Sequence, residues 1–242
     1  MDISTPSLKR KFNEKHFAVS APRYDLVTRL LSFGQDKKWK RELLELIPCQ
    51  DHPRCLDLAC GTGDVTFAMA EKYPEGDIIG IDISEPMLEI ARRKNRSDNV
   101  SLMRGELCPL EYPDESFDII TGSYALRNAP DLEAALVEIF RALKPGGIAA
   151  FLDFSKPENK SLQTLQYWTL KLWGGLWGWV LHRDPDIHGY ISASLMLYPD
   201  RSELDSLFAA AGFEIVRRRR FFLGMTEAVI LAKPAPKPAR FL

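Results

Sequence analysis

The sequence lacks the features that mark secreted, membrane-spanning and nucleic-acid-binding proteins. It has four cysteines and four histidines in 242 residues, and its formal net charge is -1. Cys49, Cys55, Cys60 and Cys108 form no CxxC pair and have no histidine at metal-ligand spacing. No apolar run approaches the ~20 residues that span a bilayer, and no apolar segment of a secretory signal is found near the N-terminus. We therefore expect a cytoplasmic protein with reduced thiols, no metal and no nucleic-acid partner.

A glycine-rich loop follows a short apolar segment in the first quarter of the chain. The segment Arg54–Asp64, RCLDLACGTGD, begins as a buried strand, turns at Gly61 and Gly63, and continues into a helical pattern. This order puts a ligand-binding loop at the carboxyl end of a parallel strand. Thr66 stands where a dinucleotide-binding GxGxxG loop needs its third glycine, which argues against a dehydrogenase. Asp57 would repel a pyrophosphate but suits a cationic amino-acid group.

A second acid, Asp82, ends the next apolar run at the spacing of a ribose contact. Together the glycine loop and this acid resemble the S-adenosylmethionine site of class I methyltransferases; the alternative is a generic α/β turn with a surface aspartate. The resemblance implies that S-adenosylmethionine is the cofactor, with Glu106 near its adenine. The implied cofactor-binding residues are Asp57, Ala59, Gly61, Thr62, Gly63, Asp82, Ile83, Met87, Glu106, Leu107 and Ser123. A non-catalytic scaffold that binds the cofactor is a further alternative. In such a protein we would expect other residues in place of the loop glycines or of Asp82, but the sequence has all of them.

Strands and helices alternate over residues 51–233, which predicts one methyltransferase domain. Strands are expected at 55–59, 77–82, 100–103, 117–121 and 148–154, helices at 65–73, 86–94 and 132–143, a helix at 201–211, and a final antiparallel pair of strands at 213–220 and 227–233. Parallel neighbours need crossover connections of this kind. We therefore expect an α/β fold with a doubly wound, mostly parallel, seven-stranded Rossmann-like sheet.

Two helical regions and a tail accompany this domain. Residues 1–50 predict an N-terminal helical cap, in which 1–20 form a loose or helical arm and helices cover 24–34 and 37–47. Residues 158–198 predict a helical insertion whose 161–181 helix is rich in tryptophan, followed by a polar loop over 182–188. This helix is compatible with a packed core helix, a homodimer contact, a lid, or peripheral contact with a membrane. Residues 234–242 are rich in proline and are predicted to form a disordered tail. The arginines at 217–220 are predicted to lie in a solvated edge strand.

The loop after the fourth strand, SYALRN, brings Tyr124, Arg127 and Asn128 to the ligand side of a parallel sheet. With it, four other segments resemble the ubiquinone/menaquinone biosynthesis C-methyltransferase family: YDLVTRLLSFGQDKKW at 24–39, LDLACGTGD at 56–64, RALKPGGIAAFLDFSKP at 141–157, and residues 190–200. The chain departs from the family signatures at four positions, which are Thr28 for Asn, Asp36 for His, Ala142 for Val and Asp153 for Glu.

This resemblance implies methyl transfer to a ring carbon of a polyprenylated hydroquinone, with contact at the inner face of the membrane. A ring carbon becomes nucleophilic when an adjacent hydroxyl loses its proton, so the reaction needs a base and a cation that stabilises the phenolate. Arg127 suits the cation and could orient a water for proton removal, while Asn128 and Tyr24 would hold the quinol oxygens. Further substrate contacts are expected from Tyr124, Asp153, Ser155, His188 and Tyr190, and His182 or His188 is an alternative base. A methyltransferase of a small phenolic metabolite is the competing enzyme reading.

Overall fold

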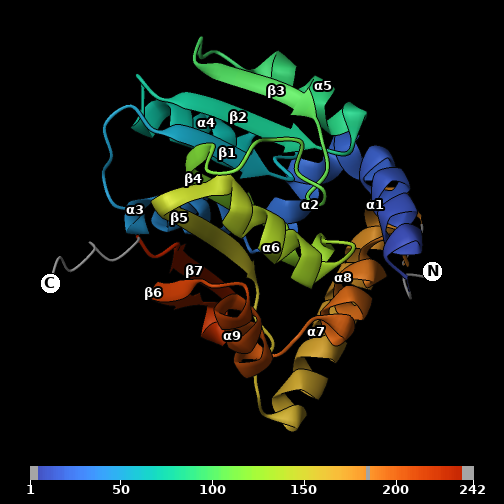
Figure 1. The fold of residues 1–242 in the computed structure, drawn as a ribbon. Coiled ribbons are helices and arrows are strands. Elements are labelled where there is room, and N and C mark those ends of the chain that lie inside the picture. The colour runs from blue at the N-terminus through green and yellow to red at the C-terminus, as the bar shows by residue number, and fades with distance from the viewer. Residues whose placement is uncertain (1–4, 184–185, 236–242) are drawn as a thin grey trace, which may run out of the picture.

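A seven-stranded sheet forms the centre of the computed structural model, which describes residues 5–183 and 186–235 (Figure 1). The strand order is β3-β2-β1-β4-β5-β7-β6. The strands are β1 Arg54–Leu58, β2 Asp77–Asp82, β3 Val100–Arg104, β4 Phe117–Ser123, β5 Leu143–Phe154, β6 Glu214–Phe221 and β7 Thr226–Ala232. β3, β2, β1, β4 and β5 pair in parallel, and β7 pairs antiparallel with both β5 and β6. The predicted mostly parallel sheet is therefore confirmed.

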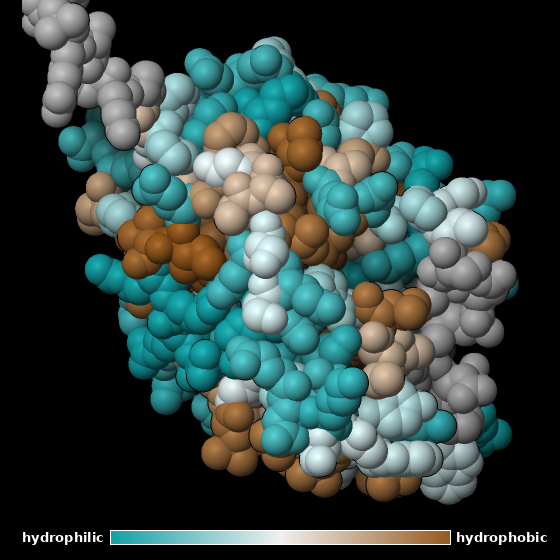
Figure 2. Space-filling model, turned by 60° about the horizontal axis from the view of Figure 1, so that its bottom comes forward, coloured by the Kyte–Doolittle hydropathy of each residue, from teal (hydrophilic) through white to brown (hydrophobic). Residues whose placement is uncertain are grey.

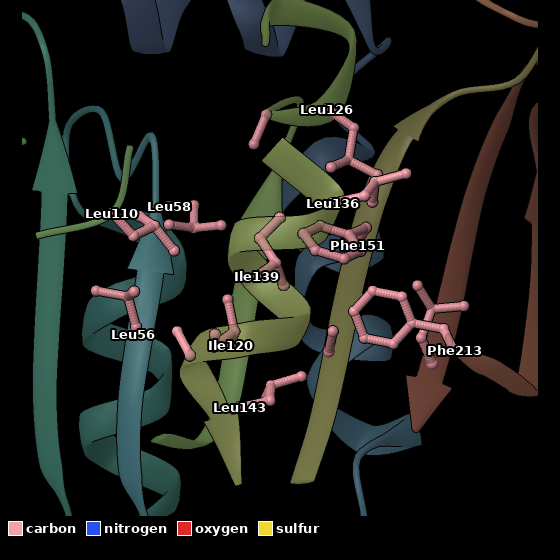
Figure 3. Packing of buried hydrophobic residues seen from close by; sticks show 14 of the residues in the cluster. Leu56, Leu58, Leu110, Ile120, Leu126, Leu136, Ile139, Leu143, Phe151 and Phe213 are labelled. Atoms are coloured by element: carbon pink, nitrogen blue, oxygen red, sulfur yellow. The ribbon is translucent and has the colours of Figure 1, made fainter. Parts of the chain in front are cut away.

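Two hydrophobic layers sandwich the sheet, because side chains alternate between its faces. In β1, Leu56 and Leu58 join a cluster with α6 (Leu132–Ala142) and α9 (Arg201–Ala210), whereas Cys55 joins a cluster with α3 (Asp36–Leu46) and α4 (Asp64–Lys72). Figure 3 shows Leu136 and Ile139 of α6 packed against side chains of the strands. α5 (Glu85–Lys94) crosses between β2 and β3.

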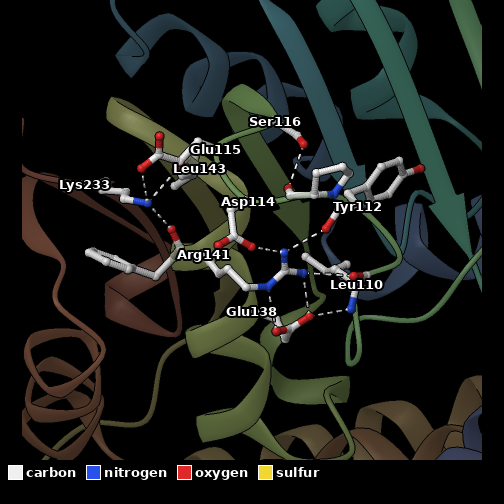
Figure 4. Close-up of polar contacts among 11 residues, drawn as sticks. Leu110, Tyr112, Asp114, Glu115, Ser116, Glu138, Arg141, Leu143 and Lys233 are labelled. Carbon is white, nitrogen blue, oxygen red and sulfur yellow. Dashed lines mark hydrogen bonds and ion pairs between the residues drawn. The ribbon is translucent and has the colours of Figure 1, made fainter.

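Arg141 of α6 anchors the loop that follows β3 (Figure 4). Its guanidinium donates to the carbonyl oxygens of Leu110 (3.0 Å) and Tyr112 (2.8 Å) and pairs with Asp114 (2.8 Å) and Glu138 (2.9 Å). These contacts fix the far end of the loop that carries Glu106 and Leu107, because one planar group holds three points of the loop.

β5 begins earlier than expected. The sequence predicts a strand from Ile148, but β5 starts at Leu143 and its pairing with β4 is irregular near the glycines. Gly146, at φ +81°, donates its N–H to the Lys233 carbonyl (2.8 Å), and the Lys233 N–H returns to Gly147 (3.0 Å). The Pro-Gly-Gly turn therefore stays hydrogen-bonded to the chain beyond β7 instead of leaving the sheet.

The N-terminal helices lie at the edge of the sheet where the parallel strands end (Figure 1). They are α1 (Pro6–Ser20), a short 3-10 turn at Ala21–Arg23, and α2 (Tyr24–Leu31). The arm of 1–20 is thus helical over its described part, and Thr5 caps α1 through its hydroxyl, which accepts from the Leu8 N–H (3.3 Å).

The insertion forms two helices, α7 (Lys160–His182) and α8 (Asp186–Leu197), which pack on each other. The predicted polar loop over 182–188 is wrong: α7 extends to His182, the chain turns at Arg183 (φ +55°), and α8 begins at Asp186. The polar residues at the start of this segment do not prevent α8 from forming, because its backbone is hydrogen-bonded as a helix. His188 therefore lies in a helix, and its side chain, like that of His182, lies outside the described part; so do residues 236–242 of the tail.

One face of α7 exposes apolar side chains at helical spacing. The residues are Leu162, Leu165, Trp168, Leu172, Leu176 and Trp179, of which Leu172 is the most exposed at 68%. On the face drawn in Figure 2, hydrophobic residues form separate groups between hydrophilic ones. Within residues 5–183 and 186–235, no helix combines the length and apolar character needed to cross a bilayer.

β6 is the edge strand that was predicted for the four arginines. Glu227 on β7 pairs with Arg218 (2.6 Å) and accepts from Arg201 (3.0 Å), and Arg219 pairs with Glu42 of α3 (3.0 Å). Neighbouring acids therefore neutralise much of the basic run.

Candidate functional site

Two cavities open where the parallel strands end, and they share a wall. The first, of about 650 Å³, lies over the ends of β1 and β2, and the second, of about 880 Å³, lies beneath α1, α2 and α7. Phe17, Tyr24, Tyr124 and Asn128 line both. A molecule in one cavity would thus face a molecule in the other across these side chains.

Asp82 holds the glycine loop at the floor of the first cavity. Its carboxylate accepts from the backbone N–H of Gly61 (2.8 Å) and of Ser84 (2.8 Å). Burial raises the pKa of Asp82 to about 6, although those N–H groups favour the charged form. Each oxygen keeps a further lone pair, and together these suit two neighbouring hydroxyl donors such as those of a ribose.

The backbone of this region is strained at residues that line the first cavity. Ala59 (φ +49°) and Tyr124 (φ +59°) adopt the left-handed conformation, although neither is glycine. Such conformations cluster at functional sites, where the surrounding structure holds them. Gly61 (φ +56°) would place a Cβ 3.9 Å from the Tyr24 ring, so a side chain there would fill the space beside the loop.

Asp57 is held by two threonines. It is buried and accepts from the hydroxyls of Thr66 (2.6 Å) and Thr121 (2.8 Å), and burial raises its pKa to about 6. Thr66, the residue that breaks the dinucleotide motif, therefore serves to fix this acid. Asp57 and Thr62 line a smaller pocket of about 320 Å³ below the loop, in which Lys40 is the cation.

Lys40 reaches this smaller pocket from α3. Its ammonium pairs with Asp36 (2.8 Å) and Asp64 (3.0 Å), and its side chain is 9% exposed. An ammonium has three donors, so one N–H remains beyond these two partners. Acids and a lysine together match the ammonium and carboxylate of a methionine group. Asp36 replaces the histidine expected from the family signature, and pairing with Lys40 accounts for an acid there.

The cavities place most predicted cofactor residues together. Ala59, Gly61, Asp82, Ile83, Met87, Glu106, Leu107 and Ser123 line the first cavity, and Asp57 and Thr62 line the adjoining small pocket. Gly63 lines neither; at φ +92° it turns the chain into α4. The buried Ser123 hydroxyl has no hydrogen-bond partner among the described residues, which leaves it available to a ligand. The residues therefore fit S-adenosylmethionine.

The N-terminal helices are tied to the loops of the first cavity. Arg10 pairs with Glu106, Glu14 with Arg104 (2.5 Å), and Asp25 accepts from Thr62 (2.6 Å). These contacts join residues 37 to 96 positions apart. The sequence offered no local signal for them, because each partner alone reads as an ordinary surface charge or hydroxyl.

Arg127 is buried at the second cavity and only partly neutralised. Its side chain is 4% exposed, its Nη1 donates to Ser194, and its Nε lies 3.6 Å from Asp153. That distance is too long for a hydrogen bond, and the Arg127 Nε has no hydrogen-bond partner in the described part of the chain. The guanidinium also lies 5.2 Å from the ring of Phe154 and 5.7 Å from that of Tyr190. A cation with a spare buried donor suits a developing phenolate.

Asn128 joins a polar network that reaches α1 and α8. The Tyr190 hydroxyl lies 2.8 Å from the Asn13 Oδ1 and 2.9 Å from the Asn128 Oδ1. The Asn13 amide donates to the Asn128 carbonyl (2.7 Å), and the Asn128 amide donates to the Tyr124 carbonyl (2.7 Å). Because a phenol has one proton, Tyr190 donates to one amide oxygen at a time. This network fixes the wall between the cavities.

Two predicted substrate residues do not reach the second cavity. Asp153 and Ser155 line a separate pocket of about 370 Å³ behind Arg127. Asp153 accepts from the Arg127 backbone N–H (3.0 Å), and Ser155 accepts from Arg201 (2.9 Å). Burial raises the pKa of Asp153, while the nearby Arg127 lowers it. Asp153 and Ser155 therefore lie on the side of Arg127 that faces away from the second cavity. The other predicted residues line the second cavity as expected: Tyr24, Tyr124, Arg127, Asn128 and Tyr190.

Several residues of the second cavity were missed by reasoning from the sequence. Among them are His16 of α1, which lies beside Tyr190, and Trp39 of α3. Helical spacing in 1–20 would have been the signal for His16, but the weak apolar pattern of α1 gave no reason to single out one face.

A family model described as the ubiE/COQ5 methyltransferase family matches residues 7–232. The chain belongs to the ubiE/COQ5 methyltransferase family. A demethylmenaquinone methyltransferase of Geobacillus stearothermophilus is 34% identical over 213 residues, which are 86% of this chain and 91% of that protein. A demethylmenaquinone methyltransferase of Lactiplantibacillus plantarum is 33% identical over 224 residues, which are 90% of this chain and 94% of that protein.

Solved structures show the same fold at low sequence identity. An S-adenosylmethionine-dependent methyltransferase of Aquifex aeolicus aligns with a TM-score of 0.59 and 18% identity over 94% of this chain and 98% of its own. The [4+2]-cyclase SpnF aligns with a TM-score of 0.64 and 20% identity over 89% and 95% of the two chains. The fold is therefore shared with a protein named for another reaction, and membership of the family is what identifies this chain as an S-adenosylmethionine-dependent methyltransferase of class I.

Proposed function

We propose that this methyltransferase transfers a methyl group to a ring carbon of a demethylmenaquinol. One observation carries the proposal: the cofactor cavity and the second cavity meet at Tyr24, Tyr124 and Asn128. A methyl donor on one side of that wall faces an acceptor on the other. The relatives named demethylmenaquinone methyltransferase support this choice of acceptor.

The second cavity favours an aromatic acceptor with an apolar substituent. Most of its lining side chains are apolar or aromatic, as in sites that bind small molecules. Val27, Leu31, Trp39, Phe154 and Leu170 supply apolar walls. Tyr24, Tyr124 and Asn128 supply polar groups on the wall shared with the cofactor cavity, so a quinol would orient its hydroxyls there and its side chain away.

The cofactor side of the reaction needs few groups. When bound, S-adenosylmethionine supplies a methyl group made electrophilic by a positive sulfur. Asp82 would hold the ribose hydroxyls, Ser123 would donate to a polar atom of the cofactor, and Asp57 with Lys40 would face its amino-acid end. Gly61 leaves room for the cofactor beside the loop.

The acceptor side needs charge stabilisation and alignment. Arg127 would stabilise the phenolate that forms when a quinol hydroxyl loses its proton. Asn128 and Tyr24 would hold the quinol oxygens so that the ring carbon lies in line with the methyl group. Asp153 would keep the arginine in place. Residues 1–50 would form a cap over the methyltransferase domain of residues 51–233. This cap and the insertion at 158–198 would together exclude water from the substrate cavity.

Labelled methyl transfer tests the proposal. The protein is incubated with S-adenosylmethionine carrying a ¹³C methyl group and with demethylmenaquinols of several prenyl lengths, and small phenols serve as competitors. We expect the label on a ring carbon of a demethylmenaquinol. Label on an oxygen, or transfer to the small phenols alone, would contradict the proposal.

We also propose that the exposed face of α7 rests on a lipid surface. The helix has Lys160 and Lys171 but no acidic residue, and Leu170 of the same helix lines the second cavity. A lipid-bound substrate could thus enter beside the surface that contacts lipid. Sedimentation with vesicles of phosphatidylglycerol and phosphatidylcholine should capture the protein, and Leu172→Asp with Leu176→Asp should release it. Protein that remains in the supernatant at twice the monomer mass would indicate instead that this face joins two copies.

A further inference from the structure

The second cavity contains a single side chain that can accept a proton near neutral pH, within the part of the chain described. No Asp, Glu or Lys is among its lining residues. Arg127 stays protonated in proteins. Burial raises the pKa values of Tyr24, Tyr124 and Tyr190, so these phenols keep their protons. Only His16 remains, because an imidazole titrates near neutrality.

Aromatic rings hold His16 on the cavity wall. Its ring centroid lies 5.3 Å from that of Phe12, 5.2 Å from that of Phe17 and 5.2 Å from that of Tyr190. The Arg127 guanidinium also lies against Tyr190, at 5.7 Å from the ring centroid. The histidine and the arginine therefore adjoin one tyrosine in the same cavity, as a base and a phenolate-stabilising cation should.

We propose that His16 is the general base of the reaction, a role that rests on the proposed function. A nitrogen of the neutral imidazole takes the proton of the quinol hydroxyl beside the accepting carbon. The O–H electron pair shifts into the ring, the ring carbon forms a bond to the methyl carbon, and the methyl–sulfur bond breaks with its electrons remaining on sulfur. The carbon then loses its own proton to water, which restores the aromatic ring as a phenolate, and the imidazolium returns its proton to that oxygen.

This division of labour explains why both side chains line one cavity. Arg127 cannot take a proton but can stabilise the anion that remains, whereas a neutral histidine can take the proton but adds no charge beforehand. Among the described residues, the charged and titratable groups that line the cavity with His16 are Arg127, Tyr24, Tyr124 and Tyr190. Of these, none titrates between pH 5 and 8 when unperturbed.

The pH dependence of kcat tests the proposal. His16→Gln should reduce kcat by about 100-fold or more and remove the fall in rate at acid pH. Imidazole added to the buffer should restore part of the rate, and binding of S-adenosylhomocysteine should remain within about 3-fold of the unsubstituted protein. His16→Phe, which preserves the ring packing, should lose the same pH dependence without loss of that binding.

His52→Gln is the matched control, since this exposed histidine pairs with Glu75 (3.1 Å) and lies outside both cavities; its kcat should be unchanged. His188→Gln should retain the fall in rate at low pH. The proposal is overturned if His16→Gln keeps that fall with kcat within about 3-fold, or if His188→Gln loses it. Failure of the unsubstituted protein to methylate any quinol would instead overturn the proposed function, and the role of His16 with it.

Discussion

The cofactor cavity and the substrate cavity are built in different ways. Loops at the ends of β1, β2, β3 and β4 form most of the first, with a few side chains from α1 and α2, so most of its geometry follows from the sheet itself. The second takes much of its wall from α1, α2, α3, α7 and α8, which are added to the sheet, and the loop after β4 contributes Tyr124, Arg127 and Asn128. The comparison indicates that cofactor binding is a property of the core fold and acceptor choice a property of the added helices. Substitutions in the core and in the added helices test this division.

The largest effect is expected from Arg127→Ala. The buried guanidinium should contribute at least about 100-fold to kcat, because it supplies charge at the developing phenolate. Binding of S-adenosylhomocysteine should stay within about 2-fold, since Arg127 lines only the second cavity. Steady-state kinetics and calorimetry measure the two quantities. A normal kcat would remove the arginine from the reaction.

The next effect concerns stability. Ile139→Ala should lower the free energy of unfolding by about 2–5 kcal/mol, because its side chain is fully buried between α6 and the sheet (Figure 3). Leu172→Ala, on the exposed face of α7, should change it by less than about 0.5 kcal/mol. Denaturant titration followed by fluorescence compares them. Equal losses would mean that the insertion is as integral to the fold as the sheet.

Asp82→Asn should weaken cofactor binding by about 10-fold or more, as expected when a charge-assisted contact is lost. With a folded-state pKa of about 6, raised by burial above its ordinary value, the Asp82 carboxyl is ionised above that pH and protonated below it. Affinity for S-adenosylhomocysteine should therefore fall as the pH drops through about 6. The variant should lack the part of this dependence that Asp82 contributes, and calorimetry at several pH values checks both. An unchanged profile would assign the titration to Asp57, which has a similar pKa.

The smallest effect is expected from Asp153→Asn. Asp153 orients Arg127 from behind by accepting from its backbone N–H and by placing a negative charge 3.6 Å from its Nε, so kcat should fall by roughly 10-fold without a change in cofactor affinity, a modest effect typical of a supporting contact. Asp153→Glu, which keeps the charge, should recover part of the rate. A loss confined to the quinol KM would instead place this acid against the substrate.

The same contrast explains what the sequence could predict. The glycine loop, Asp82 and Ser123 follow from the order of strands, because parallel strands end at one edge and their loops meet there. His16 and Asn13 could not be found in this way. They reach the site from α1, which contacts loops more than 100 residues away, such as the one that carries Asn128.

At two points the local polarity of the sequence suggested a prediction that the structure does not follow. The charged residues after His182 suggested a loop, yet Asp186–Leu197 is a helix packed on α7. Asp153 ends a strand on the ligand side of the sheet and was expected in the substrate site, but its carboxylate turns to the backbone of Arg127. In both cases contacts with distant segments decided the outcome.

A crystal structure with bound S-adenosylhomocysteine and a demethylmenaquinol analogue tests the division between the two cavities most directly. The account predicts ribose hydroxyls on Asp82, the sulfur facing the Tyr24–Tyr124–Asn128 wall, and a quinol hydroxyl within reach of Arg127. A nucleotide bound away from the ends of β1 and β2, or a quinol that cannot approach the sulfur, would contradict it.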